Sequence, residues 1–361
     1  MSTNEILFNA LRTGDLTLTN RIWMAPLTRC RAGDEHIANA LMAEYYAQRA
    51  SAGLIIAEAT MVMEGNSAFW KEPGIHSAAQ VNGWRLVTDA VHAQGGKIFL
   101  QLWHGGRACH PAFNAGKQPV APSGIAIADE VFTPEGKLPQ VMPRELSDDE
   151  LPAIIAGFKQ AAQNAKAAGF DGVEVHGANG YLLDQFWRDG SNQRAGAYGG
   201  SVENRARLML EVLNAVCEVW SSKRVGLRLS PFNSYNSMID SDPIGITTWL
   251  VKRLNDFDLA YLHVMRSDFF KVQQGDVLTP VREHYRGLLV ANMGYNAAEA
   301  AEAISAGKID AVTFGTPFLA NPDLPARFKI NAALNEPDSA TFYTWDAKGY
   351  TDYPSLAAHV L

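Results

Sequence analysis

Short apolar runs recur along the chain and are separated by longer segments with helical signatures. Continuous apolar runs of this length are typical of strands that are buried on both faces. The runs cover residues 21–24, 53–58, 97–102, 172–175, 224–229, 259–264, 287–291 and 309–314. The pattern therefore predicts eight strands, each followed by a helix.

The helical signatures include start and stop signals. Ser147-Asp-Asp-Glu150 has the form of a capping box, and the alanine-rich segment that it opens ends at Gly169. Regular alternation of strand and helix indicates a parallel sheet. Eight repeats at this chain length favour closure into a (β/α)8 TIM barrel, an α/β fold, over an open doubly wound sheet.

Three segments lie outside the repeat. Residues 7–20 are expected to form an amino-terminal hairpin that closes the bottom of the barrel, and residues 340–361 are aromatic enough to pack against it. Residues 105–146, after the third strand, are too long for a simple connection and predict a small capping subdomain over the barrel mouth. Because no linker is evident, residues 1–361 are predicted to be a single domain.

Composition limits the partners and the location. A net charge of -7 without any Lys/Arg cluster argues against nucleic-acid binding. Cys30, Cys109 and Cys217 have neither disulfide nor zinc-site spacing, so we expect no metal and a reducing, cytoplasmic location. No signal peptide or membrane span is evident. We expect small-molecule partners and a monomer or homodimer.

The chemistry of a TIM barrel lies at the carboxyl ends of its strands, where this sequence places mostly hydrogen-bond donors and one fixed cation. These residues are Thr28, Thr60, Gln101, Trp103, His104, Arg228, Asn292 and Thr316. The acid pairs of glycosidases and the ligand spacings of metal hydrolases are missing. So are the Gly-Lys-Ser/Thr phosphate loop and the Rossmann glycine motif.

Such a lining suits flavin mononucleotide (FMN). Gln101 and Thr28 can pair with its pyrimidine edge, and Arg228 can face the N1 and O2 edge, which becomes anionic on reduction. Backbone N–H groups of the loops after the seventh and eighth strands can hold its phosphate.

A further motif, His176-Gly-Ala-Asn179-Gly-Tyr181, follows the fourth predicted strand. The imidazole and the amide can both donate to one developing oxyanion, while the phenol can deliver a proton to a neighbouring carbon. The alternative is that the three residues only cap and turn the chain. Their position after the fourth of eight strands favours the catalytic interpretation.

Several motifs, in order along the chain, resemble the old yellow enzyme family of flavin-dependent ene-reductases. They are Met24-Ala-Pro-Leu-Thr-Arg29, Leu100-Gln-Leu-Trp-His-Gly-Gly-Arg107, the His176 motif extended to Phe186, Asn192-Gln-Arg194, Tyr198-Gly-Gly-Ser-Val-Glu-Asn-Arg205, Asn321-Pro-Asp-Leu324 and Gly349-Tyr-Thr-Asp-Tyr-Pro354. Thr28 resembles the classical branch, as distinct from the branch with cysteine there.

The resemblance implies roles for individual residues. His176 and Asn179 would bind the substrate oxygen, and Tyr181 would be the proton donor. Phe69, Trp103 and Tyr350 would form aromatic walls for the substrate, although core packing is an equal alternative for Phe69 and Tyr350. Cofactor binding would fall to Ala25, Pro26, Thr28, Ala59, Gln101, Arg228, Met293, Gly294, Tyr295, Gly315 and Thr316.

The implied activity is a ping-pong reaction in which NADPH or NADH reduces tightly bound FMN, which then reduces activated alkenes. Substrates would be α,β-unsaturated carbonyls, nitroalkenes or nitrate esters. The alternatives are a non-flavin TIM-barrel hydrolase, with His176 paired to Asp184 or Glu174, and a flavin-binding protein without alkene turnover.

Two departures from the family pattern concern the site. Relatives often carry Gly-Arg after the eighth strand, with the arginine on the flavin phosphate, whereas this chain has Gly315-Thr316. The missing contact is worth roughly 1.5 to 3 kcal/mol unless another cation replaces it. Phe342-Tyr-Thr-Trp-Asp346 stands where relatives tend to be glycine-rich, which predicts a bulkier pocket rim.

Overall fold

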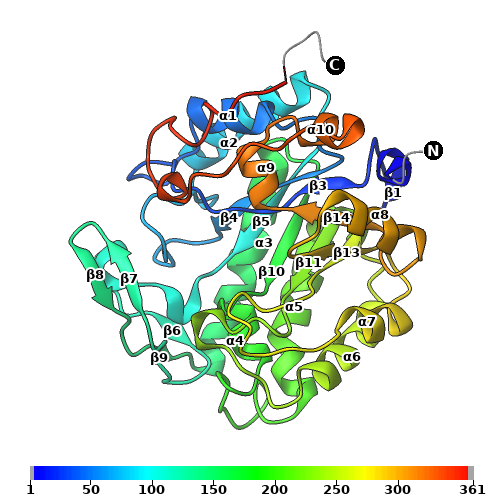
Figure 1. Ribbon diagram of the computed structural model, residues 1–361. Helices are drawn as coiled ribbons and strands as arrows, with labels where there is room; N and C mark the ends of the chain where they lie inside the picture. Colours follow the sequence, from blue (N-terminus) through cyan, green and yellow to red (C-terminus); the bar gives the residue numbers. More distant parts are fainter. Residues whose placement is uncertain (1–3, 357–361) are drawn as a thin grey trace.

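The computed structural model describes residues 4–356. Eight parallel strands close into a barrel in the order β10-β11-β12-β13-β14-β3-β4-β5, which Figure 1 shows with helices around it. The strands are β3 (Ile22–Met24), β4 (Ile55–Met61), β5 (Ile98–Trp103), β10 (Gly172–Gly177), β11 (Val225–Leu229), β12 (Tyr261–Met265), β13 (Leu289–Asn292) and β14 (Ala311–Phe314). Each predicted apolar run contributes one strand, and the TIM barrel is confirmed.

Helices follow the barrel strands along the chain. They are α1 (Ala40–Ala47), α2 (Ala78–Ala93), α3 (Leu151–Ala167), α4 (Leu182–Trp187), α5 (Val202–Trp220), α6 (Pro243–Leu254), α7 (Leu278–His284), α8 (Ala297–Ser305), α9 (Thr316–Ala320) and α10 (Leu324–Ile330). The capping box of Ser147 and Glu150 is present in the turn before α3, and Gly169 follows that helix with a left-handed φ of 89°. Within residues 4–356, no helix has the length and hydrophobicity needed to cross a membrane.

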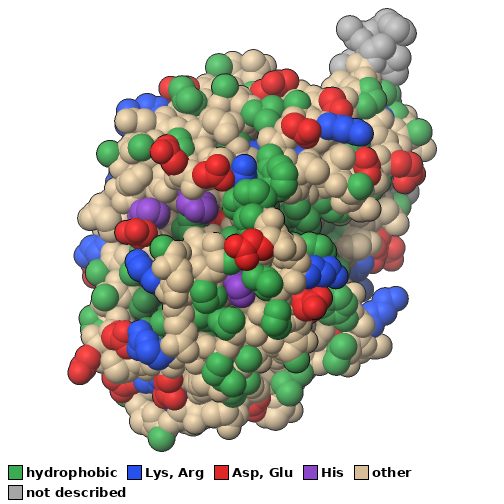
Figure 2. Space-filling view, turned by 90° about the vertical axis from the view of Figure 1, so that its left-hand side faces the viewer, with side chains coloured by type: hydrophobic (Ala, Val, Ile, Leu, Met, Phe, Trp, Pro, Cys, Tyr) green, Lys and Arg blue, Asp and Glu red, His purple; other side chains and the backbone are tan. Residues whose placement is uncertain are grey.

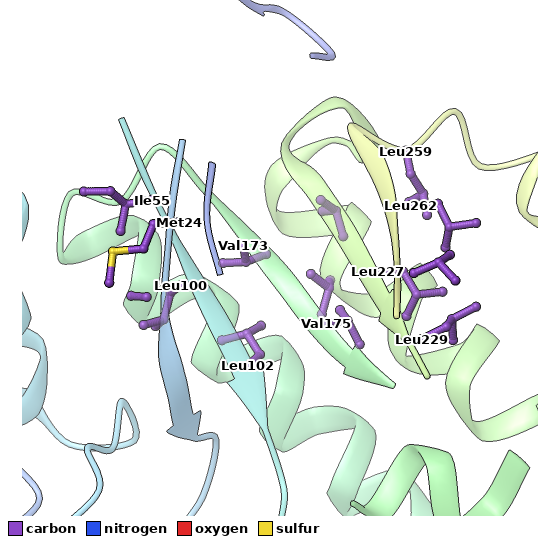
Figure 3. Close-up of a cluster of buried hydrophobic side chains, with 14 of the residues drawn as sticks. Met24, Ile55, Leu100, Leu102, Val173, Val175, Leu227, Leu229, Leu259 and Leu262 are labelled. Carbon is purple, nitrogen blue, oxygen red and sulfur yellow. The ribbon is translucent and has the colours of Figure 1, made fainter. Parts of the chain in front are cut away.

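The barrel strands are buried on both faces, but their two faces differ in chemistry. On β10, Val173 and Val175 belong to the large hydrophobic cluster that the strands share with the helices, as do Leu227 and Leu229 on β11 (Figure 3). Each such side chain contributes roughly 1.5 to 3 kcal/mol by burial. Because side chains alternate along a strand, Glu174 and the residues in step with it face the barrel interior.

The amino-terminal hairpin consists of β1 (Leu11–Thr13) and β2 (Leu16–Leu18), which pair antiparallel. Leu16 and Leu18 pack in a second hydrophobic cluster with Trp23 and Tyr261 from inside the barrel. The Thr13 hydroxyl donates to the backbone oxygen of Ala260, just before β12, at 2.8 Å. The predicted hairpin and its place at the amino-terminal end of the barrel are confirmed.

The insertion after β5 forms a small subdomain. Its strands β6 (Val120–Ala121) and β9 (Arg144–Glu145) pair parallel, and β7 (Glu130–Thr133) and β8 (Gly136–Pro139) form a hairpin. Figure 1 shows this hairpin standing out at the left of the molecule, to one side of the barrel.

The carboxy-terminal segment packs against the barrel as far as it is described. Tyr350 has no exposed surface, and Thr341 is buried as well. Residues 357–361 of the predicted packing segment lie outside the described residues.

Candidate functional site

A cavity of about 410 Å³ lies at the carboxyl ends of the barrel strands, within the size range of small-molecule sites. Its lining includes the predicted residues Pro26, Thr28, Ala59, Phe69, Gln101, His176, Asn179, Tyr181, Arg228 and Thr316. Sequence reasoning missed Leu27, Arg29, Tyr235, Phe269, Phe270 and Leu319, whereas Phe342 and Tyr343 belong to the segment that it expected to thicken the rim.

The pairing of β10 with β11 brings two of these residues together. His176 lies opposite Arg228 in the register, two positions nearer the carboxyl end of β10 than Glu174. The motif was predicted to start after the strand, but β10 extends through Gly177. His176 therefore belongs to a barrel strand that is paired with β11 at this position.

A left-handed turn follows β10. Asn179 and Gly180 have φ values of 57° and 73°. Asparagine tolerates this region better than most residues. At Gly180, an added Cβ would lie 2.7 Å from the Cβ of Asn236, so only glycine fits there. The Gly180 N–H donates to Asp184 at 2.9 Å, which ties the turn to α4.

Hydrogen bonds fix the orientation of the Asn179 amide. Asn233 Nδ2 donates to Asn179 Oδ1 at 2.9 Å, and the Asn179 backbone N–H donates to Ser230 Oγ at 2.7 Å. Within the described part of the chain, Asn179 Nδ2 has no protein acceptor. The amide therefore presents its donor end to a ligand in the cavity.

His176 is neutral in this environment. Burial, with further contributions from Arg228 and His263, lowers the pKa of His176 well below its ordinary value. Nδ1 is buried and, among residues 4–356, has no hydrogen-bond partner. A neutral imidazole has a single N–H donor, and this ring keeps it at physiological pH.

Tyr181 lies between two rings. Its ring meets those of Trp103 and His176 edge to face, with centroids 5.0 and 5.2 Å apart. Burial, together with Tyr235 and Tyr343, raises the pKa of Tyr181 well above its ordinary value, so the phenol keeps its proton. Trp103 has no exposed surface and lies behind Tyr181. Trp103 was predicted to form an aromatic wall, but it does not line the cavity, because its ring packs against that of Tyr181.

A hydrogen-bonded group that we call the polar belt lies inside the barrel and consists of Gln101, Glu174, His263 and Thr313. Gln101 donates to Glu174 at 2.7 Å, and His263 bridges Glu174 and the Thr313 hydroxyl at 2.9 and 2.8 Å. Burial raises the pKa of Glu174, but His263, Arg228 and Gln101 outweigh it and hold this pKa below its ordinary value. Burial lowers the pKa of His263 to about 4. Glu174 is therefore ionised beside a neutral His263.

The hydrolase alternative needs a carboxylate that acts with His176. Both Glu174 oxygens accept hydrogen bonds within the polar belt. Asp184 Oδ2 accepts from the Gly180 N–H and lies 3.8 Å from Arg188 Nη1. Within the described residues, neither carboxylate is a hydrogen-bond partner of His176.

Arg228 has hydrogen-bond donors without partners in the described chain. Its Nη2 donates to Asn292 at 2.9 Å, but the buried Nε and Nη1 have no partner within the described chain. Burial lowers the pKa of Arg228, opposed by Glu174, and the group remains a cation. Unpaired buried donors on a cation fit the anionic N1 and O2 edge that FMN would place here.

Other predicted cofactor-binding residues do not line the cavity. They are Ala25, Met293, Gly294, Tyr295 and Gly315. Ala25 is buried, and its N–H donates to Phe314 of β14 at 3.0 Å. Met293 and Gly294 turn sharply after β13, with φ values of 89° and 68°.

Of the two alternatives for Tyr350, the structure supports core packing and not a wall of the cavity. Its ring stacks on Tyr45 with centroids 3.9 Å apart, and the guanidinium of Arg31 lies 4.7 Å from the ring centroid. This cation and the stacked ring hold Tyr350 in the core. Tyr343, seven residues earlier, lines the cavity instead and stacks on Phe69 at 6.0 Å.

A second cavity of about 660 Å³, which we call the aromatic vestibule, adjoins the first and shares Phe69, Tyr181, Tyr235 and Tyr343 with it. Its outer wall comes from the β7–β8 hairpin and from Trp70 and Trp345, whose rings meet at 4.6 Å. Figure 2 looks onto the side that bears this hairpin and shows hydrophobic side chains gathered in the middle of the face. Residues 342–345, from the segment predicted to make the rim bulkier, line the two cavities.

Metal binding has no candidate here: no group of three or more His, Cys, Asp or Glu side chains in residues 4–356 is arranged to hold a metal ion.

Comparisons with known proteins identify the family of this chain. Residues 6–335 match the NADH:flavin oxidoreductase / NADH oxidase family. A probable flavin mononucleotide-dependent alkene reductase of Leishmania infantum is 48% identical over 358 residues, covering 98% of each chain.

Solved structures extend the likeness to the whole fold. The old yellow enzyme from Trypanosoma cruzi has a TM-score of 0.96 at 45% identity and covers 99% of this chain and 100% of its own. Morphinone reductase in complex with tetrahydroNAD has a TM-score of 0.93 at 45% identity and covers 98% of each chain. The predicted FMN dependence, reduction by NAD(P)H and ene-reductase class are confirmed, and the chain belongs to the NADH:flavin oxidoreductase / NADH oxidase family.

Proposed function

We propose that His176, Asn179 and Tyr181 share the reduction of an activated alkene among them. The observation that carries this proposal is the convergence on one cavity of the His176 imidazole, the Asn179 amide and a phenol that keeps its proton. When bound, FMN takes a hydride from NAD(P)H and gives it to the β-carbon of the alkene.

His176 and Asn179 bind the carbonyl or nitro oxygen of the substrate. Their two N–H groups stabilise the negative charge that grows on this oxygen as the β-carbon gains the hydride. Because both donors are fixed before substrate arrives, little reorganisation is needed. Tyr181 transfers its phenolic proton to the α-carbon, which completes addition of two hydrogens across the double bond, and the phenolate regains a proton from water.

Thr28, Gln101 and Arg228 are proposed to hold the flavin ring, with Pro26 and Ala59 beside it. Gln101 links the cavity to the polar belt, because its amide donates to Glu174 while its side chain also lines the cavity. This arrangement fixes the amide orientation.

Spectroscopy of the purified holoenzyme tests the function. We expect a flavin absorption spectrum, bleaching by NAD(P)H under nitrogen, and recovery on adding cyclohexenone. A colourless protein would contradict flavin binding. Bleaching without recovery by enones, nitroalkenes or nitrate esters would favour a flavin-binding protein without alkene turnover.

The two oxygen-binding donors are tested by phenol binding, because a phenol presents one oxygen to the same N–H groups. His176→Ala combined with Asn179→Ala should weaken phenol binding about tenfold or more, the loss of two hydrogen bonds. His284→Ala, in α7 and outside the cavity, serves as the control. Unchanged titrations of the double variant would exclude the proposed role.

A further inference from the structure

The loop after β13 is open to a ligand at its backbone. An added Cβ at Gly294 would meet only the Arg266 Nη2 atom, at 3.7 Å. In TIM barrels the loops after the seventh and eighth strands commonly bind phosphate, and β13 and β14 are those strands here. A phosphate ester can therefore approach this glycine closely.

Arg266 is fixed against the same loop. It directly follows β12, and its Nε donates to the backbone oxygen of Met293 at 2.7 Å. Its guanidinium lies 3.7 Å from the ring centroid of Tyr295, and two of its N–H groups bind Glu299. Of the five N–H donors of an arginine, the hydrogen bonds to Met293 and Glu299 take three.

The strand order explains how Arg266 can replace the family arginine, whose position is occupied by Thr316 in this chain. β13 lies between β12 and β14 in the barrel. An arginine at position 316 would approach the β13 loop from the β14 side, whereas Arg266 reaches it from the β12 side. The positive charge stands on the opposite flank of the same loop.

We propose that Arg266 supplies the cation for the FMN phosphate in this chain. The proposal rests on the proposed function only in that the bound flavin is FMN. Glu299 positions the guanidinium, whose Nη2 lies 3.7 Å from a Cβ built on Gly294. Thr316 adds a neutral side chain on the other flank.

Riboflavin, which lacks the phosphate, separates this role from a structural one. Flavin is removed from the holoenzyme, and the protein is titrated with FMN and with riboflavin by fluorescence quenching. Arg266→Gln should weaken FMN binding about tenfold or more, the loss of a charge-assisted contact, and leave riboflavin binding unchanged. Adding Thr316→Arg to Arg266→Gln should restore FMN affinity.

A matched control is Arg282→Gln. Arg282 pairs with Asp310 at 3.0 Å, and its side chain is 26% exposed against 27% for Arg266, but Asp310 precedes β14, at the opposite end of the barrel. Arg282→Gln should change neither titration. Equal loss of FMN and riboflavin in Arg266→Gln, or no loss of either, would overturn the proposal. Failure of the unaltered protein to bind either flavin would contradict the proposed function.

Discussion

The polar belt and the mouth of the barrel both contain buried polar side chains, but they differ in whether the polar atoms have hydrogen-bond partners. In the belt, Glu174 and His263 are fully buried and each polar atom named above has a partner. At the mouth, Arg228 and His176 are almost as buried, yet they carry nitrogen atoms without partners in the described chain. An unpaired buried donor costs roughly 1 to 3 kcal/mol. The difference marks the mouth as the place where a ligand completes the hydrogen bonding.

The largest effect at the mouth is expected from substitution of Tyr181. Tyr181→Phe keeps the ring against Trp103 and His176 but removes the proton, so alkene reduction should fall by about 10²- to 10⁴-fold, the usual range for a general acid. Reduction of the flavin by NADPH should stay near the original rate, because it needs no proton from this phenol. Stopped-flow measurement of both half-reactions checks this. Equal loss in both would show that Tyr181 only shapes the pocket.

Stability measurements test directly whether the polar belt contributes more to folding than Arg228 at the mouth. Glu174→Gln removes one acceptor from the belt and should lower the free energy of unfolding by roughly 1 to 3 kcal/mol, because it strands a buried donor. Arg228→Met removes a cation whose Nε and Nη1 lack partners, so it should cost less in flavin-free protein while weakening flavin binding. Urea unfolding of both variants without flavin gives the order. A larger loss for Arg228→Met would mean that Arg228 is as well satisfied as the belt.

The sequence predicted the barrel and most of the cavity because strand runs and their carboxyl ends follow directly from periodicity. The position of Trp103 could not be predicted because β5 extends through it, and a run buried on both faces hides which residues face inward. The core packing of Tyr350 could not be predicted for another reason. The tail has no regular period, so only the tertiary positions of Arg31 and Tyr45 decide that Tyr350 is buried and Tyr343 lines the cavity.

Arg266 shows the remaining limit. Its charge directly follows a predicted strand, which was a usable signal, but only the neighbouring position of β12 and β13 shows that it reaches the Met293 loop. Long-range register of this kind is fixed by the closed barrel and is not encoded in any local pattern.

The aromatic vestibule adds a third environment to the comparison, a largely apolar surface beside the mouth. Trp345→Ala should raise KM about tenfold for large apolar enones, since pocket contacts of this kind are worth about 1 to 3 kcal/mol, and should leave KM for cyclohexenone unchanged. Tyr353→Ala, in the same tail but outside the vestibule, is the control. A parallel rise in KM for NADPH would assign the vestibule to the reductant instead.

The smallest expected effect is that of pH on phenol binding. It tests whether His176 stays neutral at the mouth of the barrel. Burial lowers the pKa of His176 well below its ordinary value, so the neutral form prevails in the folded protein and protonation is pushed to acid pH. Above about pH 6.5, the ordinary pKa of a histidine, the donor state of His176 therefore does not change. Phenol binding measured from pH 6.5 to 9 should follow only the ionisation of the phenol and of the flavin. His176→Asn should bind more weakly at every pH with an unchanged profile. An inflection near pH 6.5 that disappears in His176→Asn would show instead that the ring titrates at its ordinary pKa, and that His176 is more solvated than its burial beside Arg228 indicates.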